Sequence, residues 1–203
     1  MKRFGKEPEA PFKKRDPVAF EAQKVKIEAL QEKARAGEIE LAYLDEAGFS
    51  CVHPNRNAWT TVGEQHLIPA TRGNRVNVLG ALMSSGYLES DVFYGGMTSS
   101  RLVDFIKEVA NKYDKPITFI LDNASFHKSK VIKEAEGYFK KSGITLEFLP
   151  PYSPELNRIE KLWHTMKHHW MEIKERTSQV LLKEITHILE NFGFQFRFDF
   201  YGK

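Results

Sequence analysis

The sequence predicts an α/β fold in which a mixed sheet of five strands is flanked by helices. Two observations lead to this prediction. The first half contains three apolar runs of strand length, and the second half alternates strand-like runs with amphipathic helical patterns. With 203 residues, 41% of them hydrophobic and 28% charged, the chain is long enough for one domain with its own core and a short appendage.

The N-terminal part is predicted to hold a linker, a helix and three strands. Residues 1–16 contain two prolines and many charges, which is typical of a basic linker. Over residues 17–37, apolar side chains near helical spacing and a terminating Gly37 indicate one amphipathic helix. Strands are expected over Glu40–Asp45, Arg75–Met83 and Ser90–Tyr94, with a hairpin flap over Ala58–Thr61 and His66–Ile68.

The C-terminal part is predicted to alternate helix and strand. The β-branched run Ile117–Leu121 is typical of a central buried strand, and Ile144–Leu149 is the next strand. Helices are expected from Thr98 or Ser99 to about Tyr113, over about Lys128–Lys141, from Ser153-Pro154 to about Lys174, and over about Ser178–Asn191. Three meandering strands joined to a parallel βαβαβ half have the topology of ribonuclease H. Residues 38–176 are therefore predicted to form this domain, and residues 177–203 a C-terminal helix with an aromatic tail.

Composition and charge exclude several classes of protein. No apolar run approaches the roughly 18 residues of a membrane span, and Met1–Lys6 lacks a signal-peptide core, so a cytoplasmic protein is expected. Cys51 is the only cysteine, which excludes an intrachain disulfide and a cysteine-based zinc site. The net charge of +3 permits nucleic-acid binding without requiring it. Residues 1–15 carry six Lys or Arg against two Glu, which fits either a solvated tail or a contact with a DNA backbone.

Three acidic residues stand where a sheet can bring them together. Asp45 ends the first strand, Asp122 follows the central strand, and Glu160 lies in the first turns of the helix after Pro150-Pro151. Acids at the ends of neighbouring parallel strands project into the crevice where open α/β sheets bind ligands. Gathered carboxylates repel one another unless divalent cations lie between them, and hard oxygen ligands suit Mg²⁺ or Mn²⁺. Two such ions about 3.5–4 Å apart can activate a water or sugar hydroxyl and stabilise the leaving oxygen of a phosphodiester.

Two neighbouring acids compete with this assignment. Glu46 follows Asp45 and points to the opposite face of a strand, so only one of the pair can face the metals, and Asp45 is preferred. Glu155 lies beside Pro154 at a helix start, where an acid mainly complements the helix dipole. Glu160 borders an apolar stripe at helical spacing, from which its side chain can reach the strand ends.

The sequence around these acids resembles one family. Leu149–Trp163 closely resembles the signature of the mariner-like transposase superfamily in its bacterial insertion-sequence branch, which has a DDE-type catalytic domain. Similar segments are Leu121–His127, Leu44–Phe49, Ala58-Trp59 followed by Gly63, and Asn77–Ala81. The resemblance spans about residues 13–170 in the right order, and its Pro-Pro-Tyr-Ser-Pro segment is highly specific. Glu155 and Arg158 stand where the family usually has Asp and Pro, and neither departure removes a catalytic group.

By this resemblance the catalytic and metal-binding triad is Asp45, Asp122 and Glu160, with two Mg²⁺ or Mn²⁺ ions as cofactors. The 37 residues between Asp122 and Glu160 are close to the family's mid-thirties spacing. The implied reaction hydrolyses the phosphodiester at the ends of a mobile element and joins the freed 3′-hydroxyl to target DNA, at short TA sites. The implied partner is double-stranded DNA, both element ends and target. The implied active form is a dimer in the bacterial cytoplasm, associated with the nucleoid.

Two alternatives stay open. A stand-alone nuclease of the same fold would cut without joining, and a catalytically silent remnant would bind DNA or a partner without chemistry. The family also places helix-turn-helix modules ahead of the catalytic domain, and the stretch before the Asp45 strand has no room for a three-helix module. The chain is therefore expected to be the second part of a split or truncated transposase, with an upstream helix-turn-helix frame. On its own it should bind DNA weakly, with steep salt dependence and little sequence preference.

Four residues are expected near DNA phosphates or the metals: His127, Arg158, His164 and Lys167. For His127, a role as a polar loop residue that caps the next helix is an equal alternative. His164 and His168 stand one turn apart, but without Cys or an acid in a metalloprotease arrangement a DNA-facing surface is preferred to a zinc site. Trp59 is predicted to anchor the flap in the core rather than to stack on a base.

Overall fold

The computed structural model describes residues 16–51, 75–122, 129–172, 174 and 176–198. The predicted hairpin flap, with Trp59, and His127 lie outside these residues, as does the basic segment 1–15. None of the described helices is both long and apolar enough to cross a membrane.

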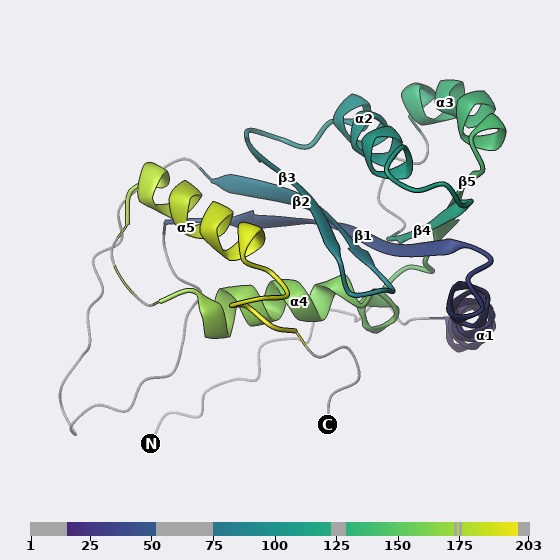
Figure 1. The fold of residues 1–203 in the computed structure, drawn as a ribbon, viewed down its shortest axis with the longest axis horizontal. Coiled ribbons are helices and arrows are strands. Elements are labelled where there is room, and N and C mark those ends of the chain that lie inside the picture. The colour runs from purple at the N-terminus through teal and green to yellow at the C-terminus, as the bar shows by residue number, and fades with distance from the viewer. Residues whose placement is uncertain (1–15, 52–74, 123–128, 173, 175, 199–203) are drawn as a thin grey trace, which may run out of the picture.

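Five strands form one mixed sheet through the centre of the molecule (Figure 1). Its order is β3-β2-β1-β4-β5. The pairs β1–β2 and β2–β3 are antiparallel, and the pairs β1–β4 and β4–β5 are parallel. The strands are β1 (Glu40–Phe49), β2 (Val76–Met83), β3 (Leu88–Tyr94), β4 (Ile117–Leu121) and β5 (Ile144–Phe148). The predicted meander joined to a parallel half is therefore confirmed.

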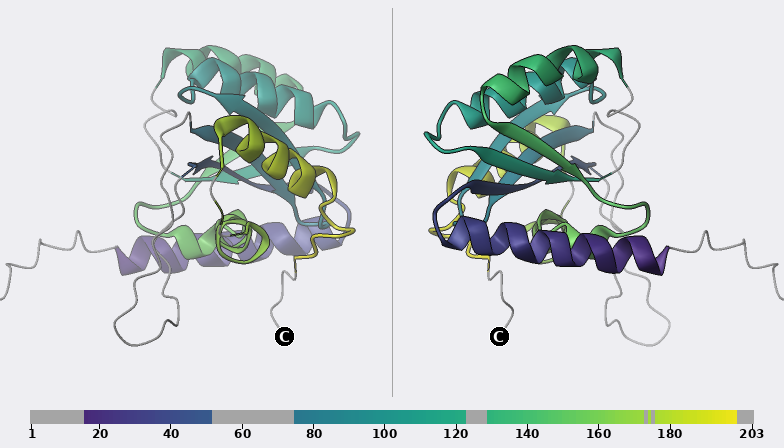
Figure 2. Two further views of the ribbon diagram at one scale, coloured as in Figure 1. Left: turned by 90° about the vertical axis from the view of Figure 1, so that its left-hand side faces the viewer. Right: turned by 90° about the vertical axis from the view of Figure 1, so that its right-hand side faces the viewer.

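Helices cover both faces of this sheet, as the two side views show (Figure 2). Two helices lie on one face: α2 (Ser99–Ala110) and α3 (Lys130–Lys141). Three lie on the other: α1 (Pro17–Arg35), α4 (Ile159–Thr165) and α5 (Ser178–Glu190). Each face has its own apolar core, and all eight residues of β2 are buried because this strand packs on both sides. Full burial of a Val, Leu, Ile, Phe or Met side chain stabilises the fold by about 1.5–3 kcal/mol.

Local signals set the ends of several helices. The Asp16 carboxylate accepts from Val18 N at 2.9 Å and caps α1. Of the two predicted caps for α2, Thr98 is the one used, since its hydroxyl accepts from Arg101 N at 3.2 Å. Gly37 adopts a left-handed φ of 74°, which a glycine reaches without strain, and so turns the chain from α1 into β1.

Strand β1 is longer than predicted. The sequence predicts its end at Asp45, but the strand continues to Phe49. Its parallel pairing with β4 ends at Leu44↔Leu121, whereas its antiparallel pairing with β2 continues to Phe49↔Val76. Asp45 therefore lies within β1, at the point where β1 loses its parallel neighbour.

The single helix predicted over residues 153–174 is wrong. A 3₁₀ turn over Pro154–Leu156 is followed by Asn157 in an extended conformation, and α4 begins only at Ile159. After Thr165 the helix widens into a π-helical turn over Met166–Trp170. The break has a physical cause, because the Asn157 side chain leaves the helical path to donate a buried hydrogen bond to Leu44 O at 3.1 Å.

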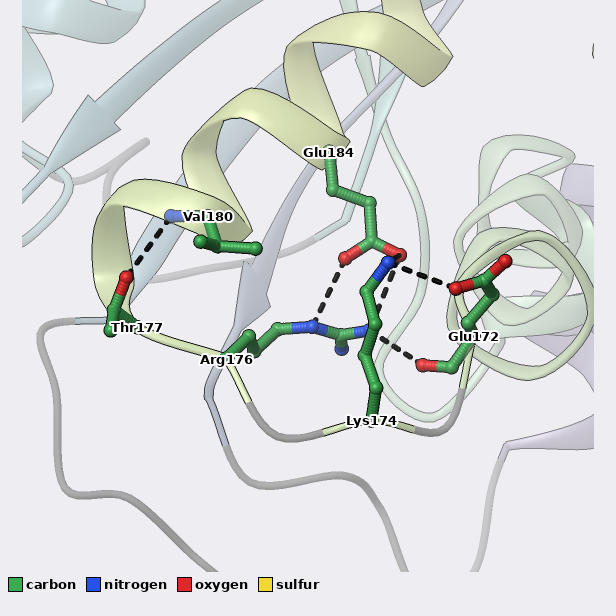
Figure 3. Close-up of polar contacts among 6 residues, drawn as sticks. All are labelled: Glu172, Lys174, Arg176, Thr177, Val180 and Glu184. Carbon is green, nitrogen blue, oxygen red and sulfur yellow. Dashed lines mark hydrogen bonds and ion pairs between the residues drawn. The ribbon is translucent and has the colours of Figure 1, made fainter.

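The connection from the π-turn to α5 is held by a buried ion pair (Figure 3). The Arg176 side chain is 1% exposed, and its Nε lies 3.0 Å from a carboxylate oxygen of Glu184 in α5. The Arg176 guanidinium also donates to Glu172 O, and Lys174 Nζ lies 3.9 Å from the same Glu184 carboxylate. Thr177 then caps α5 by accepting from Val180 N at 3.3 Å.

Part of the aromatic tail packs back onto this connection. The Trp170 ring lies 6.3 Å from the Phe192 ring and 5.4 Å from the Phe196 ring, measured between centroids. The described portion of the tail is therefore docked on the π-helical turn, whereas Phe194 is 80% exposed.

Candidate active site

The register of the two central strands brings Asp45 and Asp122 together. Tyr43 in β1 and Ile120 in β4 are Cα partners, and both side chains lie in the core on the α4 side of the sheet. Because strand side chains alternate between faces, the residues two positions further along each strand lie on this same side. Asp45 and Asp122 are these two residues. Their strands neighbour one another directly, as the sequence predicts.

Glu160 reaches the same place from the start of α4. It is the second residue of α4, and its backbone N donates to Asn157 O at 3.1 Å. Ile159, Leu162 and Trp163 bury the opposite side of this helix against the sheet, while Glu160 stays exposed. The bond from the Asn157 side chain to Leu44 O holds the start of α4 beside the residue that precedes Asp45.

A cavity of about 350 Å³ opens between these elements. Asp122, Asn157 and Glu160 line it, together with residues 149–154. On its rim, Tyr152 is 56% exposed and adopts a left-handed φ of 60°. A non-glycine residue in this region stores roughly 1 kcal/mol of strain or more, and such residues cluster at functional sites.

The three acids influence one another electrostatically. Burial, together with the negative charges of Glu160 and Asp122, raises the pKa of Asp45 to about 8. The backbone N–H of Glu46 and the indole of Trp163 act in the opposite direction on the pKa of Asp45. Burial also raises the pKa of Glu160, with a further rise from Asp122. Neighbouring negative charges repel one another, and a cation bound between them reduces this repulsion.

Lys167 is a cation whose charge acts on Glu160. It belongs to the π-helical turn, is half-buried, and its Nζ lies 5.2 Å from the centre of the Phe49 ring. Burial and the charge of Arg75 lower the pKa of Lys167, while the charges of Asp45 and Glu160 raise it. A π-helical turn shifts a side chain relative to regular α-helix and is frequent at functional sites.

The competing acids lie elsewhere. Glu46 lines a separate cavity of about 740 Å³ with Arg75 and Asn77, on the α2 and α3 side of the sheet. Glu155 is exposed in the 3₁₀ turn and does not line the cavity that holds Asp122 and Glu160. Asp122 and Glu160 therefore line one cavity, and the charges of both act on Asp45, which does not line it. Glu46 and Glu155 do not line this cavity either, and neither is among the charges that act on Asp45.

The predicted DNA-contacting residues have different surroundings. The Arg158 guanidinium lies 5.5 Å from the centre of the buried Tyr43 ring, so this side chain anchors the start of α4. His164 is exposed and stacks on His168 with ring centroids 4.4 Å apart. Of these predicted residues, Lys167 alone influences the pKa of an acid of the triad within the described part of the chain.

The donor set fits hard divalent cations, which prefer carboxylate oxygens. Among the described residues, no three His, Cys, Asp or Glu side chains stand close enough to hold a single ion. Each of two ions can instead be held by a pair of carboxylates, with one residue common to both pairs. Asp45 suits the shared position, because both Glu160 and Asp122 act on its pKa.

One residue of the site has no role in the sequence-based prediction. Asn157 is 2% exposed, ties α4 to β1, and lines the cavity. Helical spacing gives no signal for this role, because Leu156 and Ile159 continue the apolar stripe on either side of Asn157.

Residues 40–181 match the protein family described as DDE superfamily endonuclease. The chain belongs to this family. The matched residues contain β1, the strands that follow it, and all three acids of the site.

Curated relatives and solved structures agree with this membership. The chain is 28% identical over 183 residues to the 39 kDa protein of insertion element IS630 from Shigella sonnei, covering 87% of this chain and 51% of that protein. It is 29% identical over 133 residues to the transposable element Tc3 transposase of Caenorhabditis elegans, covering 61% and 40%. The chain therefore spans about half the length of the curated relatives it matches, or less.

The fold is similar to that of Mos1 mariner transposase. The crystal structure of its catalytic domain has a TM-score of 0.59 at 15% identity, covering 90% of this chain and 86% of that one. The Mos1 paired end complex with Mn has a TM-score of 0.62 at 19% identity, covering 97% and 62%. The predicted ribonuclease H-like fold and the resemblance to mariner-like transposases of the insertion-sequence branch are thus confirmed.

Proposed function

We propose that this chain is the catalytic domain of a DDE-type transposase, which cuts DNA strands and joins the freed 3′-hydroxyl to target DNA with divalent metal ions. The catalytic and metal-binding triad is Asp45, Asp122 and Glu160. The observation that supports the proposal is that Asp122 and Glu160 line one cavity and that both charges act on Asp45, although the three acids come from separate segments: β1, the residue after β4 and the start of α4. In this proposal residues 38–176 form the catalytic domain, residues 17–37 an N-terminal helix, and residues 177–203 a C-terminal helix with an aromatic tail.

Two Mg²⁺ or Mn²⁺ ions bound here would activate the attacking water or 3′-hydroxyl and neutralise charge on the leaving oxygen. A mariner paired end complex crystallised with Mn supports this choice of metal. The protein's own contribution is to hold the oxygen ligands. Asp45 and Asp122, from neighbouring strands, and Glu160, from α4, would hold the ions.

Double-stranded DNA, as element ends and target, is the proposed substrate. Lys161, His164 and Lys167 lie on and just after α4, the helix whose Glu160 lines the cavity, and can attract phosphates. A phosphate contact of this kind is sequence-independent and weakens with salt. Affinity for a terminal-repeat duplex and a scrambled duplex should therefore fall together as salt rises. A preference of more than about a hundredfold, or about 2.7 kcal/mol, would reveal a specificity element not accounted for here.

One assay separates the proposal from its alternatives. Supercoiled DNA carrying the element ends is incubated with the protein and Mg²⁺ or Mn²⁺, and products are scored for nicks and for new 3′ junctions. A transposase domain produces both, and the same reaction without metal produces neither. Nicks without junctions would identify a stand-alone nuclease. Metal-independent products, or none when an upstream helix-turn-helix protein is also supplied, would contradict the proposal.

A further inference from the structure

Trp163 lies on the apolar side of α4 and packs on Gly80, the strand partner of Asp45. Its side chain is 2% exposed, and its ring meets the Phe49 ring edge-on at 6.4 Å between centroids. The indole Nε1 is buried and has no partner at full hydrogen-bond geometry within the described residues. An unsatisfied buried donor costs about 1–3 kcal/mol, so packing alone would be better served by a phenylalanine. The indole N–H of Trp163 therefore needs a hydrogen-bond acceptor.

Gly80 provides the space in which this ring sits. It is the Cα partner of Asp45 across the β1–β2 pair. A Cβ at Gly80 would lie 2.6 Å from both Cη2 and Cζ2 of Trp163, closer than packed atoms allow. Glycine within a strand weakens it and often marks a close approach of another group. Here the absent side chain admits the indole directly beside Asp45.

The Asp45 carboxyl is the acceptor inferred for the indole N–H, because the indole packs on Gly80, the partner of Asp45 across the β1–β2 pair. The indole lowers the pKa of Asp45, as the backbone N–H of Glu46 does, although it falls short of full hydrogen-bond geometry. A carboxylate has lone pairs for several partners, so an N–H held on one side leaves the others directed away from it. In metal sites, partners of this kind orient the ligand and set the affinity for the metal.

We propose that Trp163 is a positioning residue, which uses its indole N–H to hold the Asp45 carboxylate in the orientation that receives a divalent cation. Gly80 is the residue that makes this contact sterically possible. The inference rests on the proposed function, because it takes Asp45 to be a metal ligand. It adds an indole N–H donor from outside the triad as a requirement for metal binding.

The first test replaces the donor and keeps a ring. Trp163→Phe should weaken Mn²⁺ binding, measured by calorimetry, about tenfold or more, the effect typical of removing an outer partner of a metal ligand. Trp170→Phe removes an indole that packs on Phe192 and Phe196, and should leave Mn²⁺ affinity unchanged. Tryptophan emission should change during the Mn²⁺ titration in the wild type and in Trp170→Phe, but not in Trp163→Phe.

The second test moves the ring and leaves the indole intact. Gly80→Ala places a methyl where Cη2 and Cζ2 lie, so it should displace the indole and weaken Mn²⁺ binding to a similar degree. Phenylalanine lacks these two atoms. Adding Gly80→Ala to Trp163→Phe should then weaken binding much less than Gly80→Ala does alone, and this non-additivity is the sign of a direct contact. If one variant fails to fold, the other still gives the measurement.

Asp45→Asn distinguishes a failure of the proposed metal site from a failure of the role proposed for Trp163. Wild-type Mn²⁺ affinity in Asp45→Asn would overturn the proposed metal site and the inference with it. Weakened binding in Asp45→Asn, with wild-type affinity in both Trp163→Phe and Gly80→Ala, would leave the metal site standing and overturn the role of Trp163. A lower melting temperature without a change in Mn²⁺ affinity would show that Trp163 only fills the core.

Discussion

At the scale of single residues, Asp45 has the side chain whose ionisation is most strongly opposed in the described part of the chain. It is half-buried between β2 and α4, and two other acids act on it. In the absence of a cation this arrangement opposes ionisation, so the folded protein holds the Asp45 proton up to about pH 8. The unfolded chain releases that proton near its ordinary pKa of 3.8. The difference makes stability depend on pH.

The sign of this dependence is testable with Asp45→Asn in metal-free buffer. The raised pKa of Asp45 stabilises the folded state fully below about pH 4, and this contribution is lost as pH rises toward 8. The variant and the wild type should therefore differ little below pH 4, and the variant should gain in relative melting temperature up to about pH 8. Parallel melting curves across this range would contradict the raised pKa.

At the scale of elements, the connection between α4 and α5 depends on one buried charge pair. Arg176 is almost fully buried against Glu184, and removing one partner of such a pair leaves an uncompensated charge. Arg176→Ala should lower the free energy of unfolding by about 3 kcal/mol or more, measured with urea. Replacing both residues, as in Arg176→Met with Glu184→Leu, should recover most of this loss.

An exposed pair in α1 provides the control. Arg35 and Glu32 are more than half exposed, and Arg35→Ala should cost less than about 1 kcal/mol. Equal costs for Arg176→Ala and Arg35→Ala would show that the Arg176 pair does not hold α5 in place.

The sequence predicted those features of the elements that depend on local periodicity. It did not predict the features that depend on contacts between residues distant in sequence. The strand over Ile117–Leu121 and its following Asp122 were predictable, because a buried run and its end are local features. The end of β1 was not, because it depends on pairing with β2. The break at Asn157 was also missed, since its cause is a hydrogen bond to Leu44, 113 residues away in sequence.

The candidate site shows the same division. Asp45, Asp122 and Glu160 were predicted from motif resemblance and from strand and helix geometry, and their charges influence one another in the structure. The surroundings of Trp163 were not predictable, because spacing alone assigns this residue to the apolar stripe of α4. Its relation to Asp45 requires knowing that Gly80 lies opposite Asp45 on the neighbouring strand.

At the scale of the whole molecule, a metal site formed only by folding links ion binding to global stability. The three acids come from segments up to 115 positions apart, so the unfolded chain has no such site. Saturating Mg²⁺ or Mn²⁺, at about 100 times the dissociation constant, should stabilise the fold by about 2.7 kcal/mol. For a chain of this length this corresponds to roughly 5–10 °C in melting temperature.

The choice of metal tests the competing histidine site. The gain with Mg²⁺ or Mn²⁺ should disappear in Glu160→Gln and persist in His164→Ala/His168→Ala. Stabilisation specific to Zn²⁺ that disappears in the double histidine variant would instead identify a metal site on the His164–His168 stack.

The most direct test of the central claim is DNA strand cleavage by the alanine variants of the triad. Asp45→Ala, Asp122→Ala and Glu160→Ala should each lower Mg²⁺-dependent cleavage by at least about a hundredfold, since each removes ligands worth several kcal/mol in the transition state. Glu155→Ala and Glu46→Ala, the matched acids outside the group, should cleave within a few-fold of the wild type. Near-wild-type cleavage by Glu160→Ala, with cleavage lost in Glu155→Ala, would contradict the triad.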